Sequence, residues 1–138
     1  MRWIRGWMVV VALALAACAT DSKQMNALDR AQYDWSAAIR WNDFEGAWNL
    51  VDPEYRQQHP KSALEFERYK QVQVSGYSDL ASQLAPDGLS ARREIQINVI
   101  NKHTMTERSI RYTEVWRYDA EARAWWITSG LPDFWAGM

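Results

Sequence analysis

The sequence is poor in the residues from which many active sites are built. Its 138 residues include one cysteine and two histidines. A single cysteine excludes an intramolecular disulfide. His59 and His103 lie far apart in predicted loops, without an acid or cysteine at metal-ligand spacing. No glycine-rich phosphate loop and no nucleophile elbow occurs. The motifs therefore imply no metal and no cofactor.

Positive charge and long apolar runs are also scarce. The chain has 16 lysines and arginines against 17 aspartates and glutamates. Because no basic excess is available to neutralise phosphates, nucleic acid is not an expected partner. The uncharged run of residues 6–20 is 15 residues long and ends at Asp21. A membrane-spanning helix needs about 20 apolar residues, so a permanent span is not expected.

The N-terminus has the layout of a secretory signal. Arg2 and Arg5 precede an apolar stretch, and small residues then lead to Cys18. The segment "LAAC", residues 15–18, resembles the lipobox of bacterial lipoproteins at all four positions. The resemblance implies cleavage between Ala17 and Cys18, a diacylglycerol on the Cys18 sulfur, and fatty acylation, such as palmitate, of the new amino terminus. Two alternatives are an uncleaved helix with an inert Cys18, and ordinary signal cleavage that leaves a free thiol.

The lipobox divides the chain into three parts. Residues 1–17 are the expected signal peptide, residues 18–24 a short tether, and residues 25–138 a single domain. Cleavage would leave 121 residues with 14 basic and 17 acidic side chains. Several acyl chains form a stable anchor, whereas one chain holds only marginally. By the sorting rule of lipoproteins, Ala19 rather than aspartate after the cysteine implies the outer membrane, facing the periplasm, over the inner membrane.

The first half of the domain is predicted to be helical. An apolar stripe that includes Leu28, Trp35 and Ile39 predicts a helix over about 25–41, with Asp34 facing solvent. A second helix is expected after Asn42 or Asp43, with a capping box between Asn42 and Glu45, and it should stop at Pro53. "SALEFERYK" predicts a third helix with a capping box from Ser62 to Glu65.

The second half changes to the two-residue period of strands. Alternation predicts strands at "YKQVQVSGY", with a bulge at Gly76, at "REIQINVIN", at "RSIRYTEVWRY" and near 124–130. Turn residues at 86–88, 101–104 and 119–122 separate them. Short links favour antiparallel pairing. We therefore expect an α+β fold, with N-terminal helices packed against a curved, cone-like, four-stranded antiparallel sheet.

This order of elements resembles the nuclear-transport-factor-two-like fold. The resemblance rests on "AIRWNDFEGAWNLVDPEYR", in which a helix end, a polar turn, an aromatic-rich second helix and a proline follow one another. It implies a sheet that wraps a helical hairpin around a cone-shaped cavity. A cystatin-like sheet around one helix is the nearest alternative. Since this superfamily includes both enzymes and proteins without catalysis, the fold does not decide the function.

Glu114 is the main candidate for chemistry. It interrupts an aromatic strand face between Tyr112 and Trp116. If it were buried in a cavity, desolvation would raise its pKa toward the range of a general base, with Tyr112 as a donor. This reading predicts a small isomerase- or hydratase-like enzyme. The alternative is that Glu114 pairs across the sheet with Arg92, Arg93 or Arg111, or faces solvent.

The first hypothesis is therefore a membrane-anchored lipoprotein whose domain is not catalytic. It would bind another envelope protein or a small apolar ligand, and a homodimer through the exposed sheet face is a further hypothesis. Aromatic residues are enriched in interface cores, and the binding candidates are Trp35, Trp116, Phe134 and Trp135. The alternative for the tail "GLPDFWAGM" is that its aromatic residues simply close the core.

Overall fold

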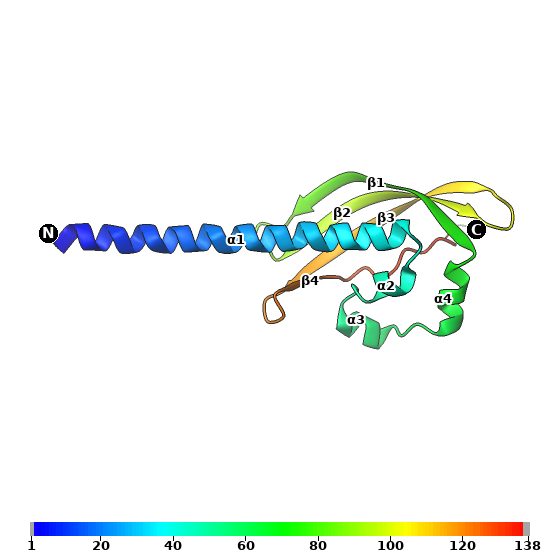
Figure 1. Cartoon of the computed structure of the whole chain (residues 1–138), viewed down its shortest axis with the longest axis horizontal. Helices are drawn as coiled ribbons and strands as arrows, with labels where there is room; N and C mark the ends of the chain where they lie inside the picture. Colours follow the sequence, from blue (N-terminus) through cyan, green and yellow to red (C-terminus); the bar gives the residue numbers. More distant parts are fainter. Residues whose placement is uncertain (1, 137–138) are drawn as a thin grey trace.

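The computed structural model describes the backbone of residues 2–136 and the side chains of residues 21–136. Four helices precede four strands, as Figure 1 shows. In chain order they are α1 (Arg2–Arg40), α2 (Phe44–Trp48), α3 (Pro53–Gln58), α4 (Ala63–Tyr69), β1 (Val72–Leu84), β2 (Ser90–Asn101), β3 (Glu107–Asp119) and β4 (Ala124–Ile127).

Helix α1 starts well before the expected residue 25 and continues through the segment 18–24 that we expected to be a tether. Its sequence contains no proline and only one glycine, Gly6, so nothing in it breaks the helix. The helix ends where Asn42 adopts a φ of 59°. The amide of Asn42 donates to the carbonyl of Ile39, and that of Asp43 donates to the carbonyl of Ala38. These two bonds form a Schellman motif, in which asparagine takes the left-handed position.

The capping box expected between Asn42 and Glu45 is wrong, because Asn42 already serves the end of α1. Asp43 caps α2 instead, and its carboxylate accepts from the amide of Gly46 at 2.9 Å. The side chain of Asn42 bonds to the edge of β1. Its amide donates to the carbonyl of Val72 at 2.8 Å, and its oxygen accepts from the amide of Val74 at 3.0 Å. One side chain thus joins the end of α1 to the sheet.

Two short helices follow α2. The prediction that the second helix stops at Pro53 is wrong, because α2 already ends at Trp48 and Val51 pairs with Ile127 before Pro53. Pro53 instead begins α3, which the sequence analysis missed. Proline suits the first turn of a helix because its missing N–H would be unpaired there. Asp52 caps α3 by accepting from the amide of Glu54. The capping box predicted for α4 is confirmed, with Ser62 and Glu65 bonded reciprocally.

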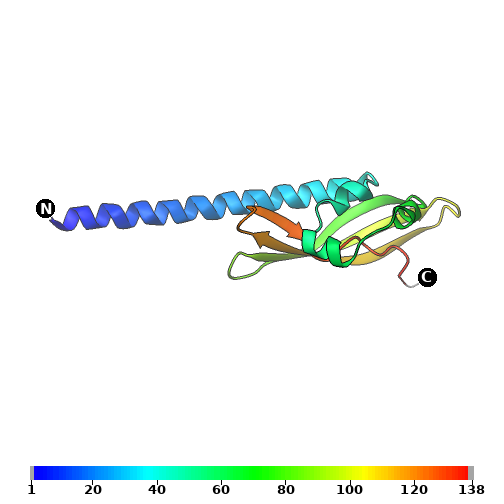
Figure 2. The same ribbon diagram turned by 90° about the horizontal axis from the view of Figure 1, so that it is seen from below.

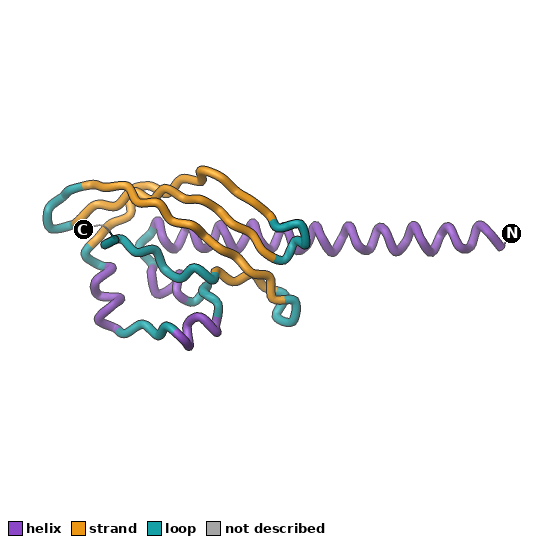
Figure 3. Tube along the Cα trace, turned by 180° about the vertical axis from the view of Figure 1, so that it is seen from behind, coloured by secondary structure: helices purple, strands orange, loops and turns teal. Residues whose placement is uncertain are grey.

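The strands form one antiparallel sheet in the order β1-β2-β3-β4, which appears as a single layer in Figure 3. The α+β class and the four-stranded antiparallel sheet are confirmed. The expected bulge in β1 is also present, because the β1–β2 register shifts between Val74 and Gly76. A second shift lies between Asp79 and Ala81, and β1 continues to Leu84, further than expected.

The core lies between α1 and one face of the sheet. Figure 2 shows α1 running along that face and extending past it toward the N-terminus. The inward side chains of β2, from Ala91 to Val99, are buried, whereas the outward ones are polar and more exposed. Leu28, Trp35 and Ile39 of α1 pack against this inner face. The predicted stripe of α1 is therefore confirmed, with Trp35 fully buried and Asp34 exposed.

The C-terminal tail closes the end of the core that lies beside α4. It turns at Gly130, whose φ of 73° favours glycine. The ring of Phe134 then packs against Phe44 and Tyr69, with ring centroids 5.7 Å apart in both pairs. The hydroxyl of Tyr69 donates to the carbonyl of Pro132 at 2.9 Å. The tail therefore contributes to the hydrophobic core.

Candidate functional site

Glu114 lies in the middle of β3 on the inner face of the sheet, and its exposed fraction is 0%. Strand alternation places it on the same side as Tyr112 and Trp116, as the sequence predicts. The register places Arg93 of β2 directly opposite. Of the three arginines considered as partners, Arg93 is therefore the one that meets Glu114.

All of the polar capacity of Glu114 is engaged by neighbouring donors. The guanidinium of Arg93 binds it in a bidentate manner, from Nε to Oε2 at 2.7 Å and from Nη2 to Oε1 at 2.8 Å. The indole Nε1 of Trp116 donates to Oε2 at 2.8 Å, and the hydroxyl of Tyr77 donates to Oε1. These four donors match the roughly four lone-pair sites that the two oxygens of a carboxylate offer.

The cluster continues from Arg93 to the surface. Its Nη1 donates to Asp79 of β1 at 3.1 Å, and the Asp79 side chain is about half exposed. On the other side, Arg40 of α1 donates to the carbonyl of Tyr77 at 3.0 Å and lies over the Tyr77 ring. The cluster of Tyr77, Asp79, Arg93, Glu114 and Trp116 therefore joins three strands, and Arg40 links it to α1.

The charge states in this cluster follow from burial and from the pairing. Burial raises the pKa of Tyr77, and the charge and hydrogen bond of Glu114 raise it further, so Tyr77 stays neutral and donates. Burial alone would lower the pKa of Arg93. Its hydrogen bonds to Glu114 and the charge of that carboxylate outweigh the burial, and the pKa is raised. Arg93 is thus a permanent cation opposite Glu114.

This geometry favours a structural role for Glu114 over a role as general base. A general base needs a free lone pair within reach of the substrate proton. Here the carboxylate is buried and hydrogen-bonded on both oxygens, so a substrate would have to displace Arg93, Tyr77 or Trp116 first. The predicted donor Tyr112 points elsewhere, since its hydroxyl donates to the carbonyl of Gly130 at 2.5 Å. Burial raises the pKa of Tyr112 as well.

The sequence analysis missed Tyr77 as a partner of Glu114. Simple alternation from Val72 and Val74 would put Gly76 inside and Tyr77 outside. The register shift at Gly76 inserts one residue, and the strand after it faces the opposite way. Tyr77 therefore points inward. Counting this bulge, which the sequence itself indicates, would have identified the residue.

Three of the four aromatic binding candidates lie in the core. Trp35 and Trp116 are fully buried and contact each other edge to face, at 6.3 Å between ring centroids. Phe134 is buried in the tail packing described above. Trp135 is half-buried, with its ring edge on Tyr69 and the Arg68 guanidinium 4.2 Å from its centroid. Trp135 is therefore the one of the four candidates whose side chain is partly exposed and could contact a partner.

The two histidines lie on the surface, as expected. His59 follows α3 and stacks on Tyr55 at 4.2 Å, while His103 is in the β2–β3 turn. Among residues 21–136, no group of three or more histidine, cysteine or acidic side chains could hold a metal ion. No helix in the described part of the chain has the length and hydropathy needed to cross a membrane.

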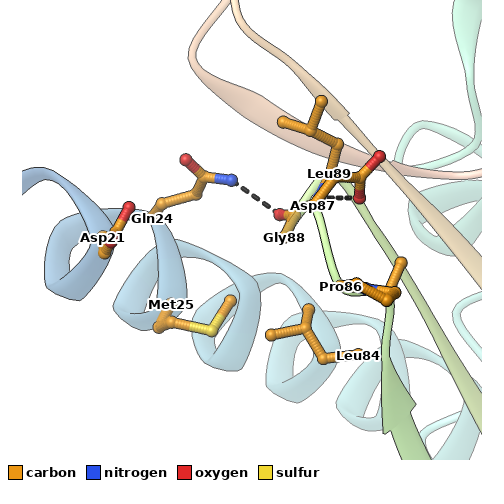
Figure 4. A pocket seen from close by; sticks show the side chains of 9 residues that line it. Asp21, Gln24, Met25, Leu84, Pro86, Asp87, Gly88 and Leu89 are labelled. Atoms are coloured by element: carbon orange, nitrogen blue, oxygen red, sulfur yellow. Dashed lines mark hydrogen bonds between the residues drawn. The ribbon is translucent and has the colours of Figure 1, made fainter.

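The lipidation residue Cys18 and the cleavage residue Ala17 belong to α1, but their side chains lie outside the described residues. Residues 21–25, which follow them in α1, contact the sheet. A pocket of about 310 Å³ lies between Asp21, Gln24 and Met25 of α1 and residues 84–89 of the β1–β2 hairpin, shown in Figure 4. A groove of about 680 Å³ lies at the other end, between α4 and the β2–β3 turn. Glu114 lines neither of them.

Comparison with known proteins gives a likeness of fold. No family model and no curated protein matches the sequence. Among solved structures, the chain is similar to a SEC-C motif containing protein from Rhodopseudomonas palustris, which was determined in solution. The two share 17% identity over 71% of this chain and 72% of that chain, with a TM-score of 0.55. This likeness concerns the fold alone.

Proposed function

We propose that the protein is a bacterial lipoprotein, anchored by acyl chains on Cys18, whose domain binds rather than catalyses. The observation that carries the proposal is the lipobox at residues 15–18, in a signal with a positive start and an apolar middle. Ala19 favours the outer membrane, facing the periplasm. The domain would bind an envelope protein or a small apolar ligand.

The state of Glu114 supports a role without catalysis. The enzyme hypothesis depended on this single carboxylate lying free in a cavity. Its four hydrogen bonds instead resemble those of a buried structural ion pair, in which polar groups are satisfied by one another. We therefore assign the cluster to fixing the sheet rather than to an isomerase or hydratase activity.

We also propose that the domain is of the nuclear-transport-factor-two-like kind. Three features support this: a long first helix that ends in a polar turn, a short aromatic helix α2 before Pro53, and a four-stranded meander whose inner face covers α1. In this protein the space between helix and sheet holds Trp35, Trp116 and Ile39, all fully buried. A ligand cavity there would require these side chains to move.

Intact mass spectrometry of the protein purified from membranes of a bacterial host tests the anchor. We expect a chain that begins at Cys18 and carries the added mass of a diacylglycerol and an amide-linked acyl chain. The variant Cys18→Ser should lose both lipobox cleavage and acylation and retain residues 1–17, while Cys18 of the native protein should resist thiol reagents. A native chain that retains Met1 and a free thiol would refute the proposal.

A further inference from the structure

The end of the sheet nearest to the anchor is fixed to α1 by two hydrogen bonds. The side chain of Gln24 donates to the carbonyl of Gly88 in the β1–β2 turn at 2.7 Å. The indole of Trp125 in β4 donates to the carbonyl of Gln24 at 3.0 Å. Figure 1 shows that the β1–β2 and β3–β4 turns both lie on the side from which α1 leaves the domain. The position of Gln24 therefore sets the position of both turns.

Gln24 lies close to the proposed anchor. Gln24 is six positions after Cys18, and an α-helix rises 1.5 Å per residue, so the two lie about 9 Å apart along the axis of α1. The headgroup region of one leaflet is roughly 5–7 Å thick, because the whole bilayer spans about 40–45 Å and its hydrocarbon core about 30 Å. Because about 9 Å exceeds this thickness, α1 must tilt from the membrane normal for Gln24, and the turn bonded to it, to reach the level of the headgroups, and acyl chains on Cys18 leave the helix free to tilt.

The β1–β2 hairpin presents apolar side chains at this level. Leu84 and Leu89 are each 48% exposed, and Pro86 between them is exposed. With Met25 they border the pocket in Figure 4. Exposed leucines in a short hairpin are unfavourable in water, whereas the interface between headgroups and acyl chains accommodates them.

The net charge at the end of the domain nearest to Cys18 indicates which type of lipid it would contact. Four acidic side chains and two basic ones lie on the first described turn of α1 and on the two turns: Asp21, Asp87, Asp119, Glu121, Lys23 and Arg123. Arg92 of β2 lines a neighbouring pocket with Leu84 and Pro86 and reduces the acidic excess. The surface remains net negative, so an anionic membrane would repel it. A membrane of zwitterionic lipid fits both its charge and its leucines.

We propose that the hairpin segment 84–89 is a second membrane contact, with Leu84 and Leu89 inserted among zwitterionic headgroups beside the lipidated Cys18. The inference rests on the proposed lipid anchor and adds the orientation of the domain to it. The anchor end faces the lipid, and the opposite end, with α4, the β2–β3 turn and the tail, faces away.

The sole cysteine makes a direct test available. In the lipidated full-length protein Cys18 is blocked, so Leu89→Cys introduces the single reactive thiol. An environment-sensitive fluorophore on this thiol is measured in phosphatidylcholine vesicles with spin-labelled lipid as quencher. We expect quenching of at least half of the emission. The matched control is Met105→Cys in the β2–β3 turn, where Met105 is 72% exposed, and its probe should lose less than a tenth.

Each outcome bears on one proposal. Leu84→Cys provides a second probe in the hairpin and should be quenched like Leu89→Cys. If neither hairpin probe is quenched more than the Met105→Cys probe, the membrane contact is refuted. Replacing half of the lipid by phosphatidylglycerol should reduce the quenching, and an increase would overturn the choice of zwitterionic lipid. Failure of the anchor itself would be seen separately, because the unsubstituted protein would then react with the fluorophore at Cys18.

Discussion

The two faces of the sheet differ in how their carboxylates are solvated and paired. Two neighbouring residue pairs of the β2–β3 ladder allow a direct comparison. Arg93 pairs with Glu114 on the inner face, and the next rung pairs Glu94 with Thr113 on the outer face. Glu114 is fully buried and receives four donors. The Glu94 side chain is 42% exposed, and its ionic partner Arg92 is 3.7 Å away.

The difference shows why one carboxylate is structural and the other replaceable. A buried charge that loses its partner remains in a medium that cannot solvate it, which costs several kcal/mol. An exposed charge that loses its partner is solvated by water, and such pairs contribute little. The same residue type, one position apart in the ladder, should therefore differ greatly in its effect on stability.

Removing the inner carboxylate should have the largest effect. We expect Glu114→Ala to lower the free energy of unfolding by about 3–5 kcal/mol, because Arg93 is left buried without its partner and Tyr77 and Trp116 lose their acceptor. Urea unfolding of the domain, followed by tryptophan fluorescence, measures the loss. A loss below about 1 kcal/mol would show that the two faces do not differ.

The double variant Arg93→Met, Glu114→Leu sharpens this result. Replacing a buried ion pair by apolar residues of similar volume is often neutral or stabilising. We therefore expect the double variant to recover most of the stability that Glu114→Ala loses. If it is no more stable than Glu114→Ala, apolar side chains cannot replace the ion pair at this position, and the charges themselves stabilise the sheet.

The tail tests how far the inner core extends. Phe134→Ala should destabilise the domain by about 3 kcal/mol, because it leaves a cavity between Phe44 and Tyr69. Trp135→Ala should have a smaller effect, since Trp135 is half-buried. Thermal unfolding of both variants, and of a chain that lacks residues 132–138, provides the measurement. An unchanged melting temperature on deletion would show that the tail is free to serve as a partner anchor.

Alkaline pH should weaken the inner face selectively. The pKa values of Tyr69, Tyr77 and Tyr112 are raised above the ordinary value of 10.0, chiefly by burial. The native state therefore favours neutral tyrosine. The resulting stability is complete below pH 10 and is lost as the pH rises above it, by about 1.4 kcal/mol per tyrosine at pH 11. Urea unfolding between pH 8 and 11 should give a shallower loss for Tyr77→Phe than for the native chain.

The smallest effect is expected on the outer face. Glu94→Ala should change the free energy of unfolding by less than about 1 kcal/mol, and the change should shrink further in high salt. The comparison with Glu114→Ala under identical conditions is the control for both variants. A salt-independent loss of several kcal/mol would mean that Glu94 has a buried partner.

The two periodicities in the sequence were sufficient to predict the fold class, the stripe of α1 and the inner face of β3. These features follow from the spacing of side chains along a single helix or strand. The helical spacing places Trp35 on the apolar face of α1, and strand alternation places Glu114 on the inner face of β3. Even the capping box of α4 follows from two side chains, Ser62 and Glu65, that lie next to each other in sequence.

Features that depend on pairing between distant segments could not be predicted in the same way. The choice of Arg93 over Arg92 or Arg111 is set by the β2–β3 register, which the length and geometry of the 102–106 turn determine. Asn42 was assigned to a local cap, although its side chain bonds to β1, which begins 30 residues later. Helix α3 was missed because the proline was interpreted only as a helix stop, whereas Pro53 occupies the first position of α3.

The two irregularities in β1 have a consequence for molecules crowded side by side. β1 is an outer strand, and past Tyr77 it carries Leu80 and Leu84 with nearly half of each side chain exposed. A flat strand of this composition would template edge-to-edge stacking into an insoluble assembly. The bulges near Gly76 and Leu80 bend and twist β1, so that a second molecule cannot form a regular ladder of hydrogen bonds along it. Asp79 adds repulsion between like charges when two copies of the strand approach. The two register shifts and Asp79 should therefore hinder aggregation through the edge of β1, the same strand that supplies Tyr77 to the core.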